Sequence, residues 1–120
     1  MKTHRDLKVW SNSINLVTQV YQITNNFPKE ELFGLTSQIR RSAVSIPSNI
    51  AEGAARTSRK EFHKFLSIAS GSASELETQL IISKNLNYLN TENSESLINE
   101  LITIQKMIQG LMKNLKSTDH

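Results

Sequence analysis

The side chains that most often perform chemistry in proteins are scattered along this sequence. The three histidines are His4, His63 and His120, and no carboxylate or second histidine lies three or four residues from His63. Glu75 and Glu77 are two residues apart, so on a helix they would point about 200° away from each other. Two-metal sites in helical bundles use a Glu-x-x-His arrangement, which the sequence lacks. We therefore expect no metal site.

Nucleophilic and phosphate-binding motifs are also missing from the sequence. The chain has no cysteine, which excludes thiol catalysis, thiolate metal ligands and disulfides. None of its serines sits in a Gly-x-Ser-x-Gly nucleophile elbow, and there is no glycine-rich phosphate loop. We therefore predict that the protein is not an enzyme, and we expect no cofactor and no small-molecule substrate.

Basic side chains gather in one part of the chain, where they outnumber the two acidic residues Glu52 and Glu61. Six lie within residues 40–64: Arg40, Arg41, Arg56, Arg59, Lys60 and Lys64. Such cations bind the phosphates of nucleic acids. The simpler alternative is that one or two of them pair with Glu52 or Glu61 while the others face water. The nearby Phe62 and Phe65 fit a core stripe, so phosphate binding without base stacking is the expected mode.

The composition describes one globular domain. The chain has 120 residues, of which 38% are hydrophobic and 21% charged, with a net charge of +3. Residues 1–60 hold nine basic and four acidic side chains, whereas residues 61–120 hold five and seven. No apolar run approaches the roughly 18 residues of a membrane span, and the N-terminal segment lacks the apolar centre of a signal peptide. We expect a cytoplasmic protein that has no contact with a membrane.

Apolar residues recur every three or four positions along four stretches, and nowhere alternate as in a strand. This spacing predicts helices over residues 6–24, 35–55, 59–87 and 94–115. Ser58 with Glu61 matches a capping box for the third helix, and Asn93 is the expected cap of the fourth. Pro47 predicts a kink or a short break in the second. Together the helices predict an all-α, antiparallel up-down-up-down four-helix bundle in a single domain, residues 1–120.

The second and third helices lack charge on sides that would otherwise face water. Glu52 is the only ionisable residue between Ser42 and Ala55, and residues 67–74 carry no charge. Exposed helix faces normally carry lysine and glutamate, so we predict that sister copies cover these surfaces and that the protein is a homo-oligomer. The predicted interface residues are Ser37, Val44, Ser48, Ala51, Ala55, Ser67, Ser70 and Ser74.

Three stretches resemble one known family. They are LKVW at residues 7–10, FPKEELFGLTSQIRRSAVSIPSNIAEGAAR at residues 27–56, and KEFHKFLSIASGSASELETQLIISKNLNYL at residues 60–89. They are similar to bacterial four-helix-bundle proteins encoded in intervening sequences of 23S ribosomal RNA genes. The accessory variability determinant of diversity-generating retroelements resembles the same family. The resemblance implies a homopentameric ring of antiparallel bundles with no known enzymatic activity.

Three functions stay open at this point. The first is a noncatalytic oligomeric module that binds structured RNA or a ribonucleoprotein partner through the basic residues. In a ring of identical subunits this basic patch would be repeated around the axis, which would strengthen its electrostatic field. The second is a protein–protein scaffold without nucleic-acid contact. The third, implied by the retroelement relative, is an accessory subunit of a reverse transcriptase that also binds nucleic acid.

Overall fold

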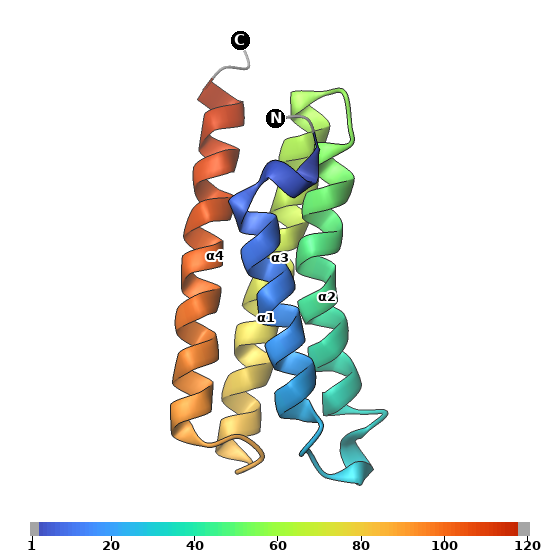
Figure 1. The fold of residues 1–120 in the computed structure, drawn as a ribbon, viewed down its shortest axis with the longest axis vertical. Helices are drawn as coiled ribbons and strands as arrows, with labels where there is room; N and C mark the ends of the chain where they lie inside the picture. The colour runs from blue at the N-terminus through green and yellow to red at the C-terminus, as the bar shows by residue number, and fades with distance from the viewer. Residues whose placement is uncertain (1–2, 118–120) are drawn as a thin grey trace.

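The computed structural model describes residues 3–117, and its regular secondary structure is helical throughout. The α-helices are α1 (Lys8–Thr24), α2 (Leu35–Ala54), α3 (Arg59–Asn85) and α4 (Thr91–Ser117), and short 3-10 helices form η1 (His4–Asp6) and η2 (Lys29–Glu31). The chain runs down α1, up α2, down α3 and up α4 (Figure 1). The predicted all-α, antiparallel four-helix bundle is therefore confirmed.

The helices follow one another around the bundle in chain order. Each α-helix packs along its two neighbours, and within the described residues the diagonal pairs α1–α3 and α2–α4 do not bring their backbones close together. The bundle measures 49 × 22 × 19 Å. The upper end, as drawn in Figure 1, holds the start of α1, the corner between α2 and α3 and the end of α4. The lower end holds the α1–α2 and α3–α4 loops, so residues far apart in sequence meet at each end.

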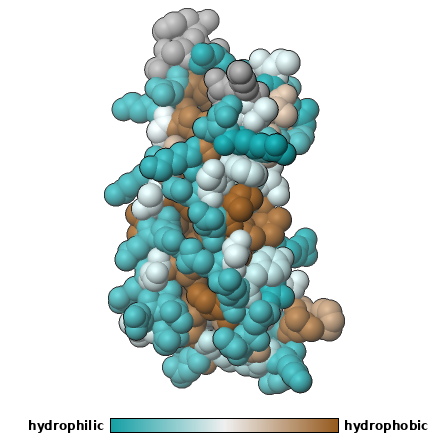
Figure 2. All heavy atoms as spheres, viewed as in Figure 1, coloured by the Kyte–Doolittle hydropathy of each residue, from teal (hydrophilic) through white to brown (hydrophobic). Residues whose placement is uncertain are grey.

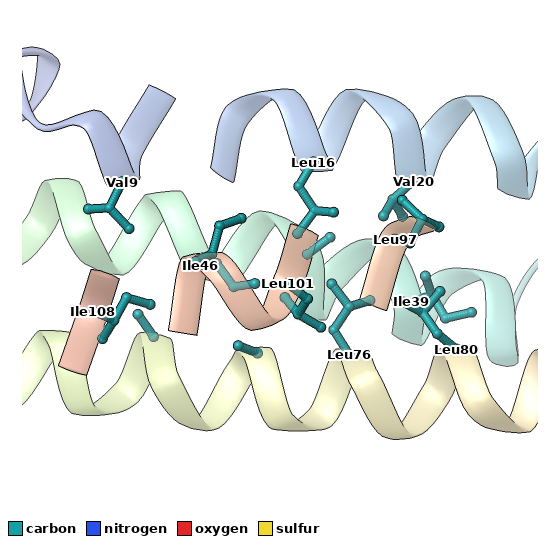
Figure 3. Close-up of a cluster of buried hydrophobic side chains, with 14 of the residues drawn as sticks. Val9, Leu16, Val20, Ile39, Ile46, Leu76, Leu80, Leu97, Leu101 and Ile108 are labelled. Carbon is teal, nitrogen blue, oxygen red and sulfur yellow. The ribbon is translucent and has the colours of Figure 1, made fainter. Parts of the chain in front are cut away.

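Side chains from all four helices form one continuous core. Figure 3 shows Leu16, Ile46 and Leu76 pointing toward one another from α1, α2 and α3, with Leu101 of α4 between them. In α2 the apolar residues that recur every three or four positions form the inner face, and Ile39, Ala43, Ile46 and Ile50 are fully buried. Burial of each large aliphatic side chain contributes about 1.5–3 kcal/mol, so this core supplies most of the stabilisation of the bundle.

Each predicted helix range differs from the observed one by one to three residues at one end or both, and two of these differences have a visible cause. The first helix begins at Lys8, because Thr3 caps the separate 3-10 helix η1 with its side chain, which accepts the Arg5 backbone N–H. The prediction that Asn93 caps the fourth helix is wrong. The Oδ1 atom of Asn90 accepts the Asn93 backbone N–H at 2.7 Å, so the cap lies one turn earlier and α4 begins at Thr91.

The Ser58 cap of α3 is confirmed, since its Oγ accepts the Glu61 backbone N–H at 3.0 Å. At Pro47, α2 continues without a break, which contradicts the alternative of a short interruption. Polar side chains support the helix there. The Nδ2 of Asn49 donates to the Ser45 carbonyl at 2.8 Å, and the hydroxyls of Ser45 and Ser72 lie 2.8 Å apart across the α2–α3 contact.

Gly53 lets the upper ends of α2 and α3 approach closely. A Cβ atom at this position would lie 2.8 Å from the Cβ of Phe65 and 2.9 Å from the Cδ1 of Phe62. Real Cβ atoms do not come so close, so any larger residue would push the two helices apart. The glycine therefore sets the geometry of the corner between α2 and α3, where most of the predicted basic residues lie.

Candidate nucleic-acid interface

Four of the six predicted basic residues lie at the upper corner. Arg56 follows the end of α2, while Arg59, Lys60 and Lys64 occupy the first two turns of α3. Arg56 forms an ion pair with Glu52, and its guanidinium lies 5.1 Å from the ring centroid of Phe65. The simpler alternative, an internal ion pair, therefore describes Arg56, although the pair is partly exposed to water.

Two of the other three residues, Arg59 and Lys60, border a shallow basic pocket together with the end of α4. A hollow of about 170 Å³ is lined by Arg59, Lys60, His63, Leu115 and Lys116. Lys60 and Lys116 are exposed, and His63 is half-buried. Several cations around one hollow create a local field that attracts a phosphate group. Sequence reasoning did not assign Lys116 to the site, because the antiparallel fold alone brings the end of α4 beside the start of α3.

Arg40 belongs to a different part of the molecule. Its Nε donates to the Thr24 Oγ1 at 2.9 Å, and a terminal nitrogen donates to the Asn25 Oδ1 at 3.1 Å. Its guanidinium also lies 4.6 Å from the ring centroid of Tyr21. Arg40 is half-buried and ties the start of α2 to the end of α1 near the lower end. Its geometry favours a structural role over phosphate binding.

Arg41 is exposed but lies apart from the upper corner. It borders a hollow of about 370 Å³ beside α2 and α3, which is lined by Gln38, Arg41, Ser42, Ser45, Ser72, Glu75 and Gln79. Fifteen residues separate Arg41 from Arg56, which corresponds to about 22 Å along a helix. The structure therefore divides the six basic residues into the upper corner and two separate positions lower on α2.

The charges are divided between the two ends of the bundle. When each helix is cut at its middle, the upper half of the described chain holds nine basic and three acidic side chains. The lower half holds four basic and seven acidic side chains. The bundle is thus electrostatically polar along its long axis. A polyanion approaching the protein would be drawn to the upper end and repelled from the lower one.

The predicted interface residues of α2 border an apolar surface. Val44, Ser48 and Ala51 help to line a hollow of about 360 Å³ that we call the α1–α2 groove. Its lining residues are His4, Trp10, Ile14, Val17, Thr18, Val44, Pro47, Ser48 and Ala51. Ser37 is half-buried and Ala55 exposed outside this groove. Three of the predicted interface residues thus line an apolar groove, which is the kind of surface that another molecule covers. The subunit contact itself stays a prediction.

The predicted residues of α3 lie elsewhere. The hydroxyl of Ser70 donates to the Gln105 Oε1 at 2.9 Å, and the Gln105 Nε2 donates to the Ser74 Oγ at 3.2 Å. Gln105 of α4 thus forms hydrogen bonds within the same chain to the uncharged middle of α3. Ser67 is exposed, so its role in a subunit contact stays a prediction.

Other kinds of site find no support in the described part of the chain. Residues 3–117 contain no group of three or more histidine, aspartate or glutamate side chains placed to hold a metal ion. Within the same residues, no helix combines the length and the apolar character needed to cross a bilayer.

Comparison with known proteins identifies the family. Over residues 5–110 the sequence matches the family described as 23S rRNA-intervening sequence protein. The chain belongs to this family. The family resemblance seen in the sequence is therefore confirmed. The matched residues include most of the four helices.

A solved structure of this kind has the same fold. It is the crystal structure of a protein with unknown function from the S23 ribosomal protein family of Bacteroides thetaiotaomicron. The two chains are 30% identical with a TM-score of 0.79, and the match covers 88% of this chain and 98% of the other. No curated protein matches the chain. These comparisons establish the family and the fold.

Proposed function

We propose that this 23S rRNA-intervening sequence protein is a noncatalytic homo-oligomeric module that binds structured RNA, alone or in a ribonucleoprotein, through its upper end. The observation that carries the proposal is the excess of nine basic over three acidic side chains in the upper half. Lys60, Lys64 and Lys116 are exposed there, on two helices that meet at one corner. Phosphate oxygens are the ligands that such a surface attracts.

The expected mode of binding is to the RNA backbone. The half-buried aromatic side chains near the corner, Phe62 and Phe65, lie against the α2–α3 contact and are not free to stack on bases. Each neutralised phosphate makes the affinity depend on salt, with a slope of about −0.7 to −0.9 per contact in logarithmic units. One bundle offers few such contacts. The proposed oligomer, a pentamer by family resemblance, would multiply them within the cytoplasm.

A mobility-shift titration of structured RNA over a salt series tests the proposal. The doubly reversed variant Lys60→Glu/Lys64→Glu should bind at least about tenfold more weakly with a smaller salt slope, because two attractive contacts become repulsive. The matched control Lys29→Glu/Lys84→Glu changes the same charge at the lower end, and its affinity should stay close to that of the wild type. Circular dichroism would verify that both variants fold.

Two outcomes would contradict RNA binding at the upper end. Absence of binding by the wild-type protein at low salt would remove the function altogether. Equal losses in the two variants would show that net charge, and not the upper corner, attracts the RNA. A protein–protein scaffold would then be favoured, and partners retained after nuclease treatment and after charge reversal at Arg56 and Arg59 would support it.

A further inference from the structure

Phe33 is the most exposed large apolar side chain of the described residues. It is 94% exposed, and its neighbour Leu32 is 48% exposed. In Figure 2 hydrophobic atoms project from the lower end of the molecule, over the loop between α1 and α2. An aromatic ring that stays in water does not gain the stabilisation that burial of its apolar surface provides. Aromatic side chains that become buried when two proteins bind are common anchors of protein interfaces.

The loop presents this ring from a fixed position. The Oε1 of Glu31 accepts the Leu35 backbone N–H at 3.2 Å, and its Oε2 accepts the Tyr88 hydroxyl at 3.0 Å. The Tyr88 ring in turn lies 5.6 Å from the ring of Phe27, centroid to centroid. Phe33 thus sits between two anchored points of the chain. A side chain held in place before binding loses less entropy when it docks.

The α1–α2 groove offers a complementary hollow. At about 360 Å³ it is roomy enough for one aromatic side chain, and its walls are mostly apolar. Ile14 and Val44 on its two sides are each 38% exposed, so the groove is uncovered in the single chain. Figure 2 shows hydrophobic residues gathered over α1 and α2 near the middle of this face. The groove therefore has unsatisfied apolar surface of the kind that an aromatic anchor fills.

The Phe33 ring of the same chain cannot reach this groove. Ser48, which lines it, lies 15 residues after Phe33, most of them in α2. At 1.5 Å per helical residue, the separation along the bundle is about 20 Å. The occupant must come from another molecule. We propose that Phe33 of one copy inserts into the α1–α2 groove of a second copy; this inference rests on the homo-oligomer in the proposed function.

The charges of the two surfaces agree with this docking. Phe33 follows Glu30 and Glu31 in the acidic lower half of the bundle. The groove extends from the middle of the bundle into its basic upper half, where His4 lines it and the exposed Arg5 and Lys8 follow in the chain. Docking places an acidic end of one copy beside the basic end of another. Such complementarity orients two surfaces and disfavours contacts between like ends.

The contact joins two different surfaces of the same chain. Two copies can exchange their Phe33 rings around a two-fold axis, or each copy can pass its ring to the next one around a closed ring. Both arrangements use the same pair of surfaces and differ only in the number of copies that they connect. A covalent link between the surfaces would therefore test the docking and count the copies in one experiment.

The absence of cysteine from the sequence makes such a link specific. We would oxidise the variant Leu32→Cys/Ser48→Cys, which keeps the Phe33 ring and places the thiol on its exposed neighbour, and analyse it without reductant. The two positions are too far apart for a disulfide within one chain, because bridged Cα atoms lie within about 7 Å. We expect covalent oligomers that reductant returns to monomer. A single dimer band would indicate a two-fold exchange, and a ladder of larger species a ring. The control Leu32→Cys/Thr78→Cys pairs the same position with an exposed residue outside the groove and should form no covalent oligomer.

A second measurement keeps the docking falsifiable if oxidation perturbs the protein. Light scattering of Phe33→Ser should show at least a tenfold rise in the concentration at which the oligomer dissociates. Leu86→Ser, a matched change of a 49% exposed residue at the lower end, should leave this concentration unchanged. An oligomer that survives Phe33→Ser, together with absence of the 32–48 cross-link, would overturn the docking alone. A wild-type particle of 13.6 kDa would overturn the homo-oligomer as well, whereas RNA binding is measured separately.

Discussion

The two ends of the bundle are closed in different ways. At the upper end, Gly53 lets the backbones of α2 and α3 approach, so the corner is held by close packing and its charged side chains point into water. At the lower end, the loops are joined by side-chain bonds, including those of Glu31 to the Tyr88 hydroxyl and of Arg40 to Thr24. There Phe33 is the most exposed of several exposed apolar side chains.

This difference shows how one simple fold can carry two kinds of surface. Close packing holds the upper end together, where the exposed Lys60, Lys64 and Lys116 are the side chains that our proposal assigns to phosphate binding. Bonds between side chains at the lower end occupy the polar groups and fix an aromatic ring in the solvent. The upper end therefore suits a polyanion, and the lower end suits an apolar groove on another molecule.

The largest effect should follow from closing the space at Gly53. In Gly53→Ala the new methyl group would meet the Cβ of Phe65, which is fixed to the backbone of α3 and cannot swing aside. Overpacking of this kind costs about 1–3 kcal/mol, and it should lower the free energy of unfolding measured by urea denaturation. The upper corner should open, so RNA affinity should fall as well.

Gly71→Ala is the matched control for this prediction. Both glycines lie inside long helices, but a Cβ atom on Gly71 would meet nothing within 4 Å. Alanine favours a helix over glycine by about 1 kcal/mol, so Gly71→Ala should be neutral or stabilising. Equal destabilisation by the two changes would show that helix propensity, and not the contact at the upper corner, explains Gly53.

A smaller effect is expected from Arg40 at the lower end. In Arg40→Met the bonds to Thr24 and Asn25 and the contact with the Tyr21 ring are lost. Because Arg40 is half-buried, we expect the free energy of unfolding to fall by about 1–2 kcal/mol. The exposed Arg41 has no such bonds, and Arg41→Met should cost less than about 0.5 kcal/mol.

The same pair of variants separates structure from binding. If the upper corner binds RNA, Arg40→Met should leave RNA affinity close to that of the wild type once its folded fraction is taken into account. A loss as large as that of Lys60→Glu/Lys64→Glu in the mobility-shift assay would instead place the lower half of α2 within the RNA interface.

Much of this fold could be predicted from local patterns. The period of apolar residues gave four helices near the observed ranges, and Ser58 marked the start of α3 because its hydroxyl caps a backbone N–H within one turn. The start of α4 was less certain in the sequence. Asn90 and Asn93 carry the same capping amide, and only the structure shows which of them accepts the bond.

The candidate site depended on distances that local patterns do not contain. Arg40 and Arg56 belong to one basic stretch of sequence, but a rigid helix separates them, whereas Lys116 joins Arg59 only through the antiparallel arrangement. The exposed Phe33 was missed because its loop has no period from which exposure can be inferred. The signal available was an aromatic residue outside every apolar stripe, two positions after the charged run of residues 29–31.

The smallest predicted effect concerns the bond between Tyr88 and Glu31 at the lower end. Accepting this hydrogen bond, the Glu31 carboxylate raises the pKa of Tyr88 above its ordinary value of about 10, with further contributions from desolvation and from the charges of Glu31 and Glu30. A raised pKa means that the folded state favours the neutral hydroxyl. The bond therefore stabilises the protein below pH 10, and the stabilisation is lost as the pH rises through the raised pKa.

Removal of the hydroxyl should therefore matter at neutral pH and cease to matter in strong base. We expect Tyr88→Phe to unfold at a slightly lower urea concentration than the wild type at pH 7, and we expect the difference to shrink above pH 10. Glu31→Gln is the matched control, because it removes the charge but keeps an acceptor, and it should lower the Tyr88 pKa seen by ultraviolet absorbance. Equal stability of wild type and Tyr88→Phe across this range would mean that the ring packing, which phenylalanine keeps, and not the hydrogen bond, holds the two lower loops together. Phe33 would then owe its fixed position to the contact between the rings of Phe27 and Tyr88.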